Sequence, residues 1–119
     1  MKSRTLLNSF KFAWQGFMWA FKNQRNLRIH TFIGIGVILA GLILKLTPLK
    51  IAVLLLTIMF VIVCEIINTA LELSFDFANG TKFNPSIKVV KDIVAAGVLF
   101  ASLNAIVVGI IIFYPYVFK

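Results

Sequence analysis

The sequence predicts an all-α membrane protein in which one amphipathic surface helix precedes three transmembrane helices, all within a single domain over residues 1–119. Two observations predict this class. The chain is 61% hydrophobic, which is more than a soluble domain of 119 residues can bury, because small domains have a large surface for their volume. The apolar residues also gather into three long runs, each close to the length that crosses a bilayer.

Residues 5–22 are predicted to form the surface helix. Apolar side chains, many of them aromatic, recur there every three or four residues, and the polar side chains fall on the opposite side. Aromatic side chains opposite basic ones are typical of a helix in the lipid headgroup region. A helix that binds a soluble partner is the alternative.

The three membrane spans are expected at about residues 29–46, 51–77 and 88–113. Pro48 is expected to mark the interruption between the first two spans. The sequence Tyr-Pro-Tyr at 114–116 is predicted to end the third span with an interfacial aromatic pair. Small residues in the first and third spans allow close helix approach, and a subunit with three spans needs partners to bury its polar groups. We therefore expect a homo-oligomer.

The formal net charge is +8, and nine of the twelve Lys and Arg residues either precede the first span or lie between the second and third. This distribution predicts a multi-pass protein with a cytoplasmic N-terminus, a cytoplasmic loop at 77–88 and an external C-terminus. The basic residues stand at the ends of apolar runs rather than in a tract with stacking aromatics. Nucleic acid is therefore not an expected partner.

Three of the four acidic residues lie in the second span, where a charge is costly and usually functional. Glu65, Glu72 and Asp76 occupy positions i, i+7 and i+11, so they project from a helix within about 40° of one another. Asn68 falls close to the same face. The sequence therefore predicts a polar stripe that runs from within the membrane to its cytoplasmic surface.

The fourth acid, Asp92, follows Lys91 at the cytoplasmic end of the third span. Antiparallel packing of the second and third spans would bring both residues level with Glu72 and Asp76. Grouped carboxylates favour a divalent cation, and Mg²⁺ commonly joins one or two carboxylates to nucleotide phosphates. A carboxylate withdrawn from water suits general-base chemistry, and a lysine can neutralise phosphate, as phosphoryl transfer requires.

The spacing alone leaves other functions open. Glu65 is also a suitable coupling site for a small ion-coupled transporter, and the acids can form purely structural ion pairs. The sequence contains no Walker A or kinase-type glycine-rich loop. His30 is expected to be packed or to contact headgroups, and the lone Cys64 to be a small buried hydrophobic residue.

Two motifs carry a family resemblance: Glu-x-x-Asn-x-Ala-x-Glu over residues 65–72, followed by Asp76, and Lys-Asp-x-x-Ala-Ala-Gly over residues 91–97. Together they resemble the signature of the bacterial membrane diacylglycerol kinase and undecaprenol kinase family. The segment at 25–30 and the tail at 109–115 resemble its Gram-positive, undecaprenol-preferring branch. The resemblance covers nearly the whole chain.

The resemblance implies a homotrimer in the bacterial cytoplasmic membrane, with sites between subunits that use Mg²⁺ and ATP to phosphorylate undecaprenol or diacylglycerol. The implied roles follow the motif positions. Glu65 would be the base, Asn68 would orient the site, Glu72 would hold the metal, and Lys91, Asp92 and Asp76 would serve the nucleotide.

One position departs from the family pattern. The family usually has a glutamate just before its Arg-Asn pair as a second metal ligand, and this chain has Gln24 there. An amide retains an oxygen ligand but loses a charge, so metal affinity is expected to fall. A catalytically silent membrane scaffold is therefore a further alternative to the kinase.

Overall fold

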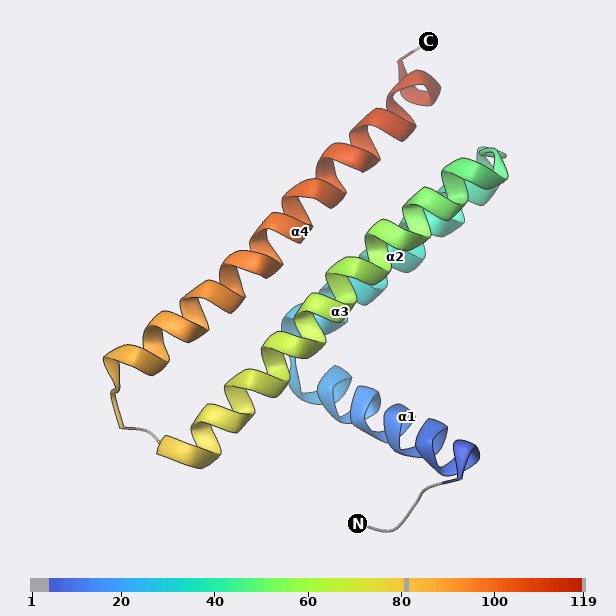
Figure 1. Cartoon of the computed structure of the whole chain (residues 1–119). Coiled ribbons are helices and arrows are strands. Elements are labelled where there is room, and N and C mark those ends of the chain that lie inside the picture. The colour runs from blue at the N-terminus through green and yellow to red at the C-terminus, as the bar shows by residue number, and fades with distance from the viewer. Residues whose placement is uncertain (1–4, 81, 119) are drawn as a thin grey trace.

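The computed structural model describes residues 5–80 and 82–118, and this part of the chain forms four α-helices (Figure 1). They are α1 (Leu6–Asn23), α2 (Arg25–Ile43), α3 (Pro48–Asn79) and α4 (Pro85–Val117). Within the described residues no strand is present, which confirms the predicted all-α class. Figure 1 shows α2 beside α3 and α4 running antiparallel to α3, while α1 projects from the bundle at the end where the chain enters α2.

The helix boundaries follow from capping residues. The side chain of Thr47 accepts a hydrogen bond from the Lys50 N–H, and Pro48 occupies the first turn of α3, where its missing N–H costs nothing. Asn84 caps α4 in the same way. At the end of α3, Gly80 adopts φ 63°, a left-handed conformation that glycine adopts without steric cost.

Helix α4, which corresponds to the predicted third span, extends further than the sequence predicts. We expected Tyr-Pro-Tyr at 114–116 to end it, but α4 continues to Val117 with Pro115 inside. A proline in the last turn removes only one terminal backbone hydrogen bond, so the helix tolerates it there. Tyr116 also anchors this end, because its hydroxyl lies 3.1 Å from Lys50 Nζ on α3.

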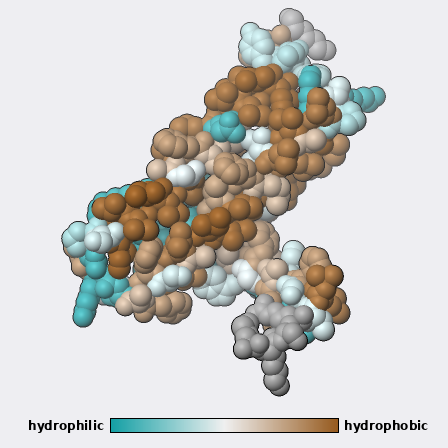
Figure 2. All heavy atoms as spheres, viewed as in Figure 1, coloured by the Kyte–Doolittle hydropathy of each residue, from teal (hydrophilic) through white to brown (hydrophobic). Residues whose placement is uncertain are grey.

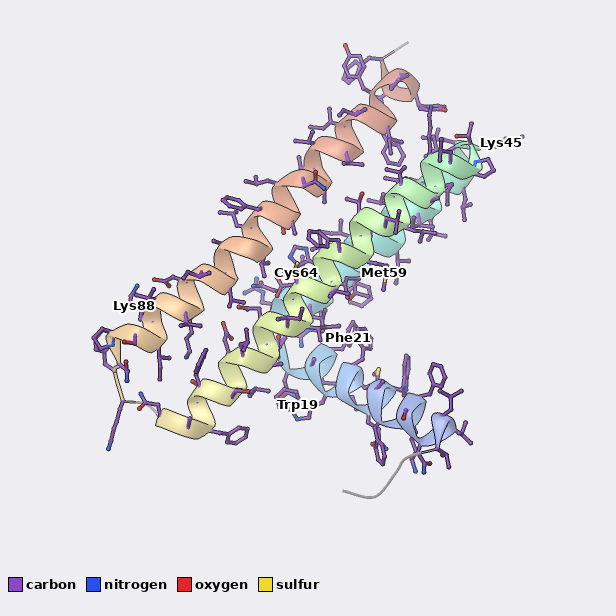
Figure 3. All side chains as sticks on the ribbon, in the orientation of Figure 1. Trp19, Phe21, Lys45, Met59, Cys64 and Lys88 are labelled. Carbon is purple, nitrogen blue, oxygen red and sulfur yellow. The ribbon has the colours of Figure 1, made fainter. Side chains whose placement is uncertain are left out.

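Three of the helices, α2, α3 and α4, are long and apolar enough to cross a membrane. Many of their large apolar side chains face outward, and Figure 2 shows hydrophobic surface along the bundle with hydrophilic residues toward its ends. Lys45 and Lys88 lie at opposite ends of this bundle (Figure 3). The chain is therefore a membrane protein with three candidate spans.

Two apolar clusters hold the helices together. Leu27 of α2, which is 0% exposed, packs with Ala20 of α1 and Ile62 of α3. At the other end, Leu46, Leu54 and Ile112 form a second cluster. The first cluster also receives aromatic side chains from the last turns of α1, whereas the first turns of α1 expose their apolar side chains. That α1 lies on a membrane surface stays a prediction.

Two glycines on α2 provide a test of this packing. A Cβ added to Gly34 would lie 2.6 Å from Ile58 Cγ2 of α3, whereas a Cβ on Gly36 would meet no atom of the described residues within 4 Å. Both substitutions gain helix propensity, so their difference isolates the clash. We expect Gly34→Ala to unfold with a free energy about 1–3 kcal/mol lower than Gly36→Ala. Denaturant unfolding in detergent checks this, and equal stabilities would contradict the close contact.

Candidate functional site

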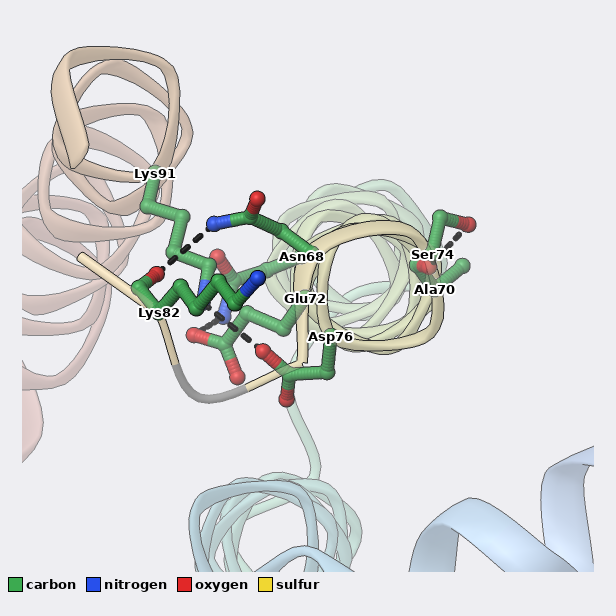
Figure 4. Close-up of polar contacts among 8 residues, drawn as sticks. Asn68, Ala70, Glu72, Ser74, Asp76, Lys82 and Lys91 are labelled. Carbon is green, nitrogen blue, oxygen red and sulfur yellow. Dashed lines mark hydrogen bonds and ion pairs between the residues drawn. The ribbon is translucent and has the colours of Figure 1, made fainter. Parts of the chain in front are cut away.

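The predicted polar stripe forms on one side of α3. Asn68 Nδ2 donates to Glu72 Oε1 at 3.4 Å, and Figure 4 shows Asn68, Glu72 and Asp76 directed toward Lys91 of α4, while Ser74 lies on the opposite side of the helix. The i, i+4 spacing of Asn68 and Glu72 places their side chains one above the other. The carboxylates of Glu72 and Asp76 and the amide of Asn68 therefore share one side of α3, as the sequence predicts.

The third and fourth helices meet at this stripe. Lys91 Nζ lies 3.0 Å from Asp76 Oδ1, as the expected antiparallel packing requires. The carboxylate of Asp92 pairs with Lys88 of the same helix at 2.7 Å. One residue turns a helix by about 100°, so Asp92 does not share the direction of Lys91. Both pairs are exposed and each stabilises the fold by only about 0–1 kcal/mol.

Glu65 lies deeper in the bundle and is only 3% exposed. Its Oε1 is 3.3 Å from Nε2 of His30 on α2, and His30 is its one ion-pairing or hydrogen-bonding partner within residues 5–80 and 82–118. The sequence prediction for His30, packing or headgroup contact, missed this pairing. No signal in the sequence indicates the pairing, because the spacing within each helix does not fix the register between α2 and α3.

Gln24 forms the junction between α1 and α2. Its backbone N–H donates to Ala20 O at 2.7 Å, and it stands at the N-cap of α2, where its side chain makes no capping hydrogen bond to the described residues. Arg28 fixes the junction, because its Nη1 donates to the carbonyl oxygens of Phe21 and Lys22 at 3.0 and 2.8 Å. These bonds satisfy carbonyl groups that the end of a helix leaves free. The position of residue 24 is therefore well defined by the backbone.

Two clefts lie near these residues, one lined by Asp76 of the stripe and one lined by His30, the partner of Glu65. One, of about 630 Å³, lies where α3 passes into α4 and is lined by Asp76 together with three lysines, Lys82, Lys88 and Lys91. The ammonium groups of lysine side chains bind phosphate as compact positive charges. The sequence prediction did not assign Lys82 and Lys88 to the site, although Lys82 lies in the loop between the predicted second and third spans and Lys88 is the first residue of the third.

The second cleft, of about 540 Å³, lies between α4 and the pair α2 and α3. Its lining is almost entirely apolar and begins at His30, the partner of Glu65, from which it extends along the bundle toward Phe118. An apolar cleft that starts beside a buried carboxylate can receive a hydrocarbon chain that ends in a polar group.

The oxygen atoms near Glu72 fit a hard cation only in part. Among residues 5–80 and 82–118, no group of three or more His, Cys, Asp and Glu side chains gathers at a metal-binding distance. However, Asn68 Oδ1 is buried and accepts no hydrogen bond from any residue that the structure describes, one helical turn from the Glu72 carboxylate. A carboxylate and an unpaired amide oxygen suit Mg²⁺, which completes its shell with water and phosphate oxygens rather than with further protein ligands.

Comparison with known proteins places the chain in a family. The sequence profile of the prokaryotic diacylglycerol kinases matches residues 11–113. A diacylglycerol kinase of Synechocystis sp. is 45% identical over 104 residues, which are 87% of this chain and 59% of that relative. The undecaprenol kinase of Bacillus subtilis is 27% identical over 107 residues, which are 90% of this chain and 86% of that relative. The chain thus spans about three fifths of the Synechocystis relative's length, and it belongs to the prokaryotic diacylglycerol kinase family.

Proposed function

We propose that this protein is a lipid kinase that transfers the γ-phosphoryl group of ATP to the terminal hydroxyl of a membrane lipid, in a reaction that requires Mg²⁺. The observation that carries the proposal is the arrangement along α3. The buried carboxylate of Glu65 contacts His30, which lines an apolar cleft. Further along the same helix lie Asn68 and Glu72, and beyond them Asp76 lines the lysine-lined cleft. Family membership supports the same chemistry.

In the proposed reaction Glu65 accepts the proton of the lipid hydroxyl. The hydroxyl oxygen forms a bond to the γ-phosphorus, the bond from that phosphorus to the bridging oxygen breaks, and ADP leaves with the electron pair. Glu65 is suited to this role because it is withdrawn from water and its partner His30 lines the apolar cleft.

The remaining site residues bind and orient the nucleotide. Asn68 holds the Glu72 carboxylate, and Glu72, with Gln24, is proposed to bind Mg²⁺, which when bound supplies positive charge to the phosphates. Lys91, Asp92 and Asp76 are proposed to contact the nucleotide. Lys91 is held near the lysine-lined cleft by its ion pair with Asp76, and this position suits an ammonium group that neutralises phosphate.

The proposed substrates are undecaprenol and diacylglycerol, which share a long apolar body and a hydroxyl group. The segment at 25–30 and the tail at 109–115 favour undecaprenol, and the names of the two relatives give one example of each substrate. The apolar cleft beside His30 fits the hydrocarbon part of either lipid.

The proposed assembly is a homotrimer in the bacterial cytoplasmic membrane, with its sites between subunits. In support, the single chain leaves much of the apolar surface of its helices uncovered. The excess of basic residues before α2 and between α3 and α4 supports a cytoplasmic N-terminus and an external C-terminus. This topology places the lysine-lined cleft in the cytoplasm, where ATP is present.

The test is transfer of radiolabelled phosphate from ATP to undecaprenol or diacylglycerol in mixed micelles, with and without Mg²⁺. We expect labelled lipid that depends on Mg²⁺, and the preferred acceptor identifies the substrate. A folded oligomer that labels neither lipid would contradict the proposal. Proton-coupled uptake without ATP would then favour the transporter, and nucleotide binding without turnover would favour the scaffold.

A further inference from the structure

His30 and Glu65 form a contact between two membrane-crossing helices that the reaction described above does not yet use. The imidazole Nε2 lies 3.3 Å from Glu65 Oε1, and the side chain of His30 is 27% exposed against 4% for Glu65. His30 also begins the lining of the apolar cleft. The imidazole therefore lies where the proposed lipid site meets the proposed base.

Close helix packing on both sides of His30 fixes this contact. About one turn before it, Leu27 is fully buried against Ile62, the residue one turn before Glu65. One turn after it, Gly34 lies directly against Ile58. The backbone positions of His30 and Glu65 are thus set by apolar contacts of their own helices, independently of the polar contact between them.

The chemistry of the pair suits the orientation of a base. A glutamate side chain has three rotatable bonds, so a carboxylate without a partner samples several rotamers. An Nε2–H donor holds one carboxylate oxygen and leaves the other for a substrate hydroxyl. An arginine at position 30 would place a permanent full charge against Glu65, whereas an imidazole can hold the carboxylate as a neutral donor.

We propose that His30 is a positioning residue that holds the Glu65 carboxylate toward the apolar cleft, an inference that rests on the proposed function of Glu65 as the base. His30 acts through Glu65 and does not itself take the proton of the lipid. The contact Nε2 to Oε1, the burial of Glu65 and the place of His30 at the cleft carry this assignment.

The kinetic test compares His30→Leu with His30→Gln, and uses the neighbouring, exposed Ile29→Leu as the control. Misplacing a reacting group by about 1 Å costs about 100-fold, so we expect His30→Leu to lower kcat about tenfold to 100-fold with little change in the KM of ATP or lipid. The amide of His30→Gln reaches a similar position to Nε2 and should recover most of kcat. Unchanged kcat in His30→Leu, a loss confined to KM, or no recovery by His30→Gln would overturn the proposal.

A second measurement does not depend on turnover. The chain contains one histidine, so ¹⁵N-histidine labelling of protein purified without a histidine tag reports this imidazole alone. We expect a proton on Nε2 in the unmodified protein and a changed Nε2 resonance in Glu65→Gln. Identical spectra would overturn the contact even if the chain is an active kinase. A changed resonance in a chain that transfers no phosphate would instead refute the proposed function and leave the contact standing.

Discussion

Glu65→Gln is expected to lower the kcat of phosphate transfer by about 10²–10⁴-fold, because it removes the proposed general base without changing the shape of the side chain. The amide keeps an oxygen that can accept from His30 Nε2, so the helices α2 and α3 should remain packed. The loss should therefore appear in turnover and not in the assembly. Initial rates at saturating ATP and lipid, together with size-exclusion profiles in detergent, measure both quantities.

Cys64→Ser provides the matched control. Cys64 precedes Glu65 on α3 and is a free, partly buried thiol that belongs to none of the proposed roles. We expect this variant to retain turnover, which would show that small changes beside Glu65 are tolerated. If Glu65→Gln turned over lipid at the rate of the control, another group would have to accept the hydroxyl proton.

The parts of the fold that depend on local sequence were predictable. The three apolar runs and Pro48 locate the helices to within a few residues, and the structure adds the capping residues Thr47, Asn84 and Gly80. The extension of α4 through Pro115 was missed. A proline disrupts the interior of a helix, but in the last turn it removes only one backbone hydrogen bond, and the sequence alone does not show which case applies. Whether α1 lies on the membrane surface depends on contacts with lipid, which the sequence of the helix does not determine.

The candidate site was predictable where its residues share one helix. Asn68 and Glu72 are paired by helical spacing alone, and the i+7 and i+11 positions of the acids fix a common face. Contacts between helices require a register that periodicity does not supply. Lys91 therefore meets Asp76 as expected while Asp92 pairs with Lys88, and the contact of His30 with Glu65 was overlooked.

Glu72→Gln is expected to raise the Mg²⁺ concentration at half-maximal rate by at least about tenfold, since even indirect partners of a metal contribute that much to affinity. Asn68 Nδ2 can still donate to the amide oxygen of the variant, so the geometry of α3 should persist and the change is one of charge. Mn²⁺ binding followed by electron paramagnetic resonance separates ion binding from chemistry. A Glu72→Gln protein with normal Mg²⁺ dependence would remove Glu72 from the ligand set.

Gln24→Glu extends this prediction, because it adds the charge that the family usually has at the α1–α2 junction. The backbone there is fixed by the Gln24 N–H bond to Ala20 O and by Arg28, so the substitution changes the ligand and not its position. If residues 24 and 72 hold one ion, Gln24→Glu lowers the Mg²⁺ requirement, and the size of this change differs between the unmodified protein and Glu72→Gln, so that the two substitutions are not additive. Additive effects would mean that the two side chains act separately. An unchanged Mg²⁺ dependence in Gln24→Glu would show that residue 24 is no ligand, and that the neutral amide at this position costs the protein nothing in metal binding.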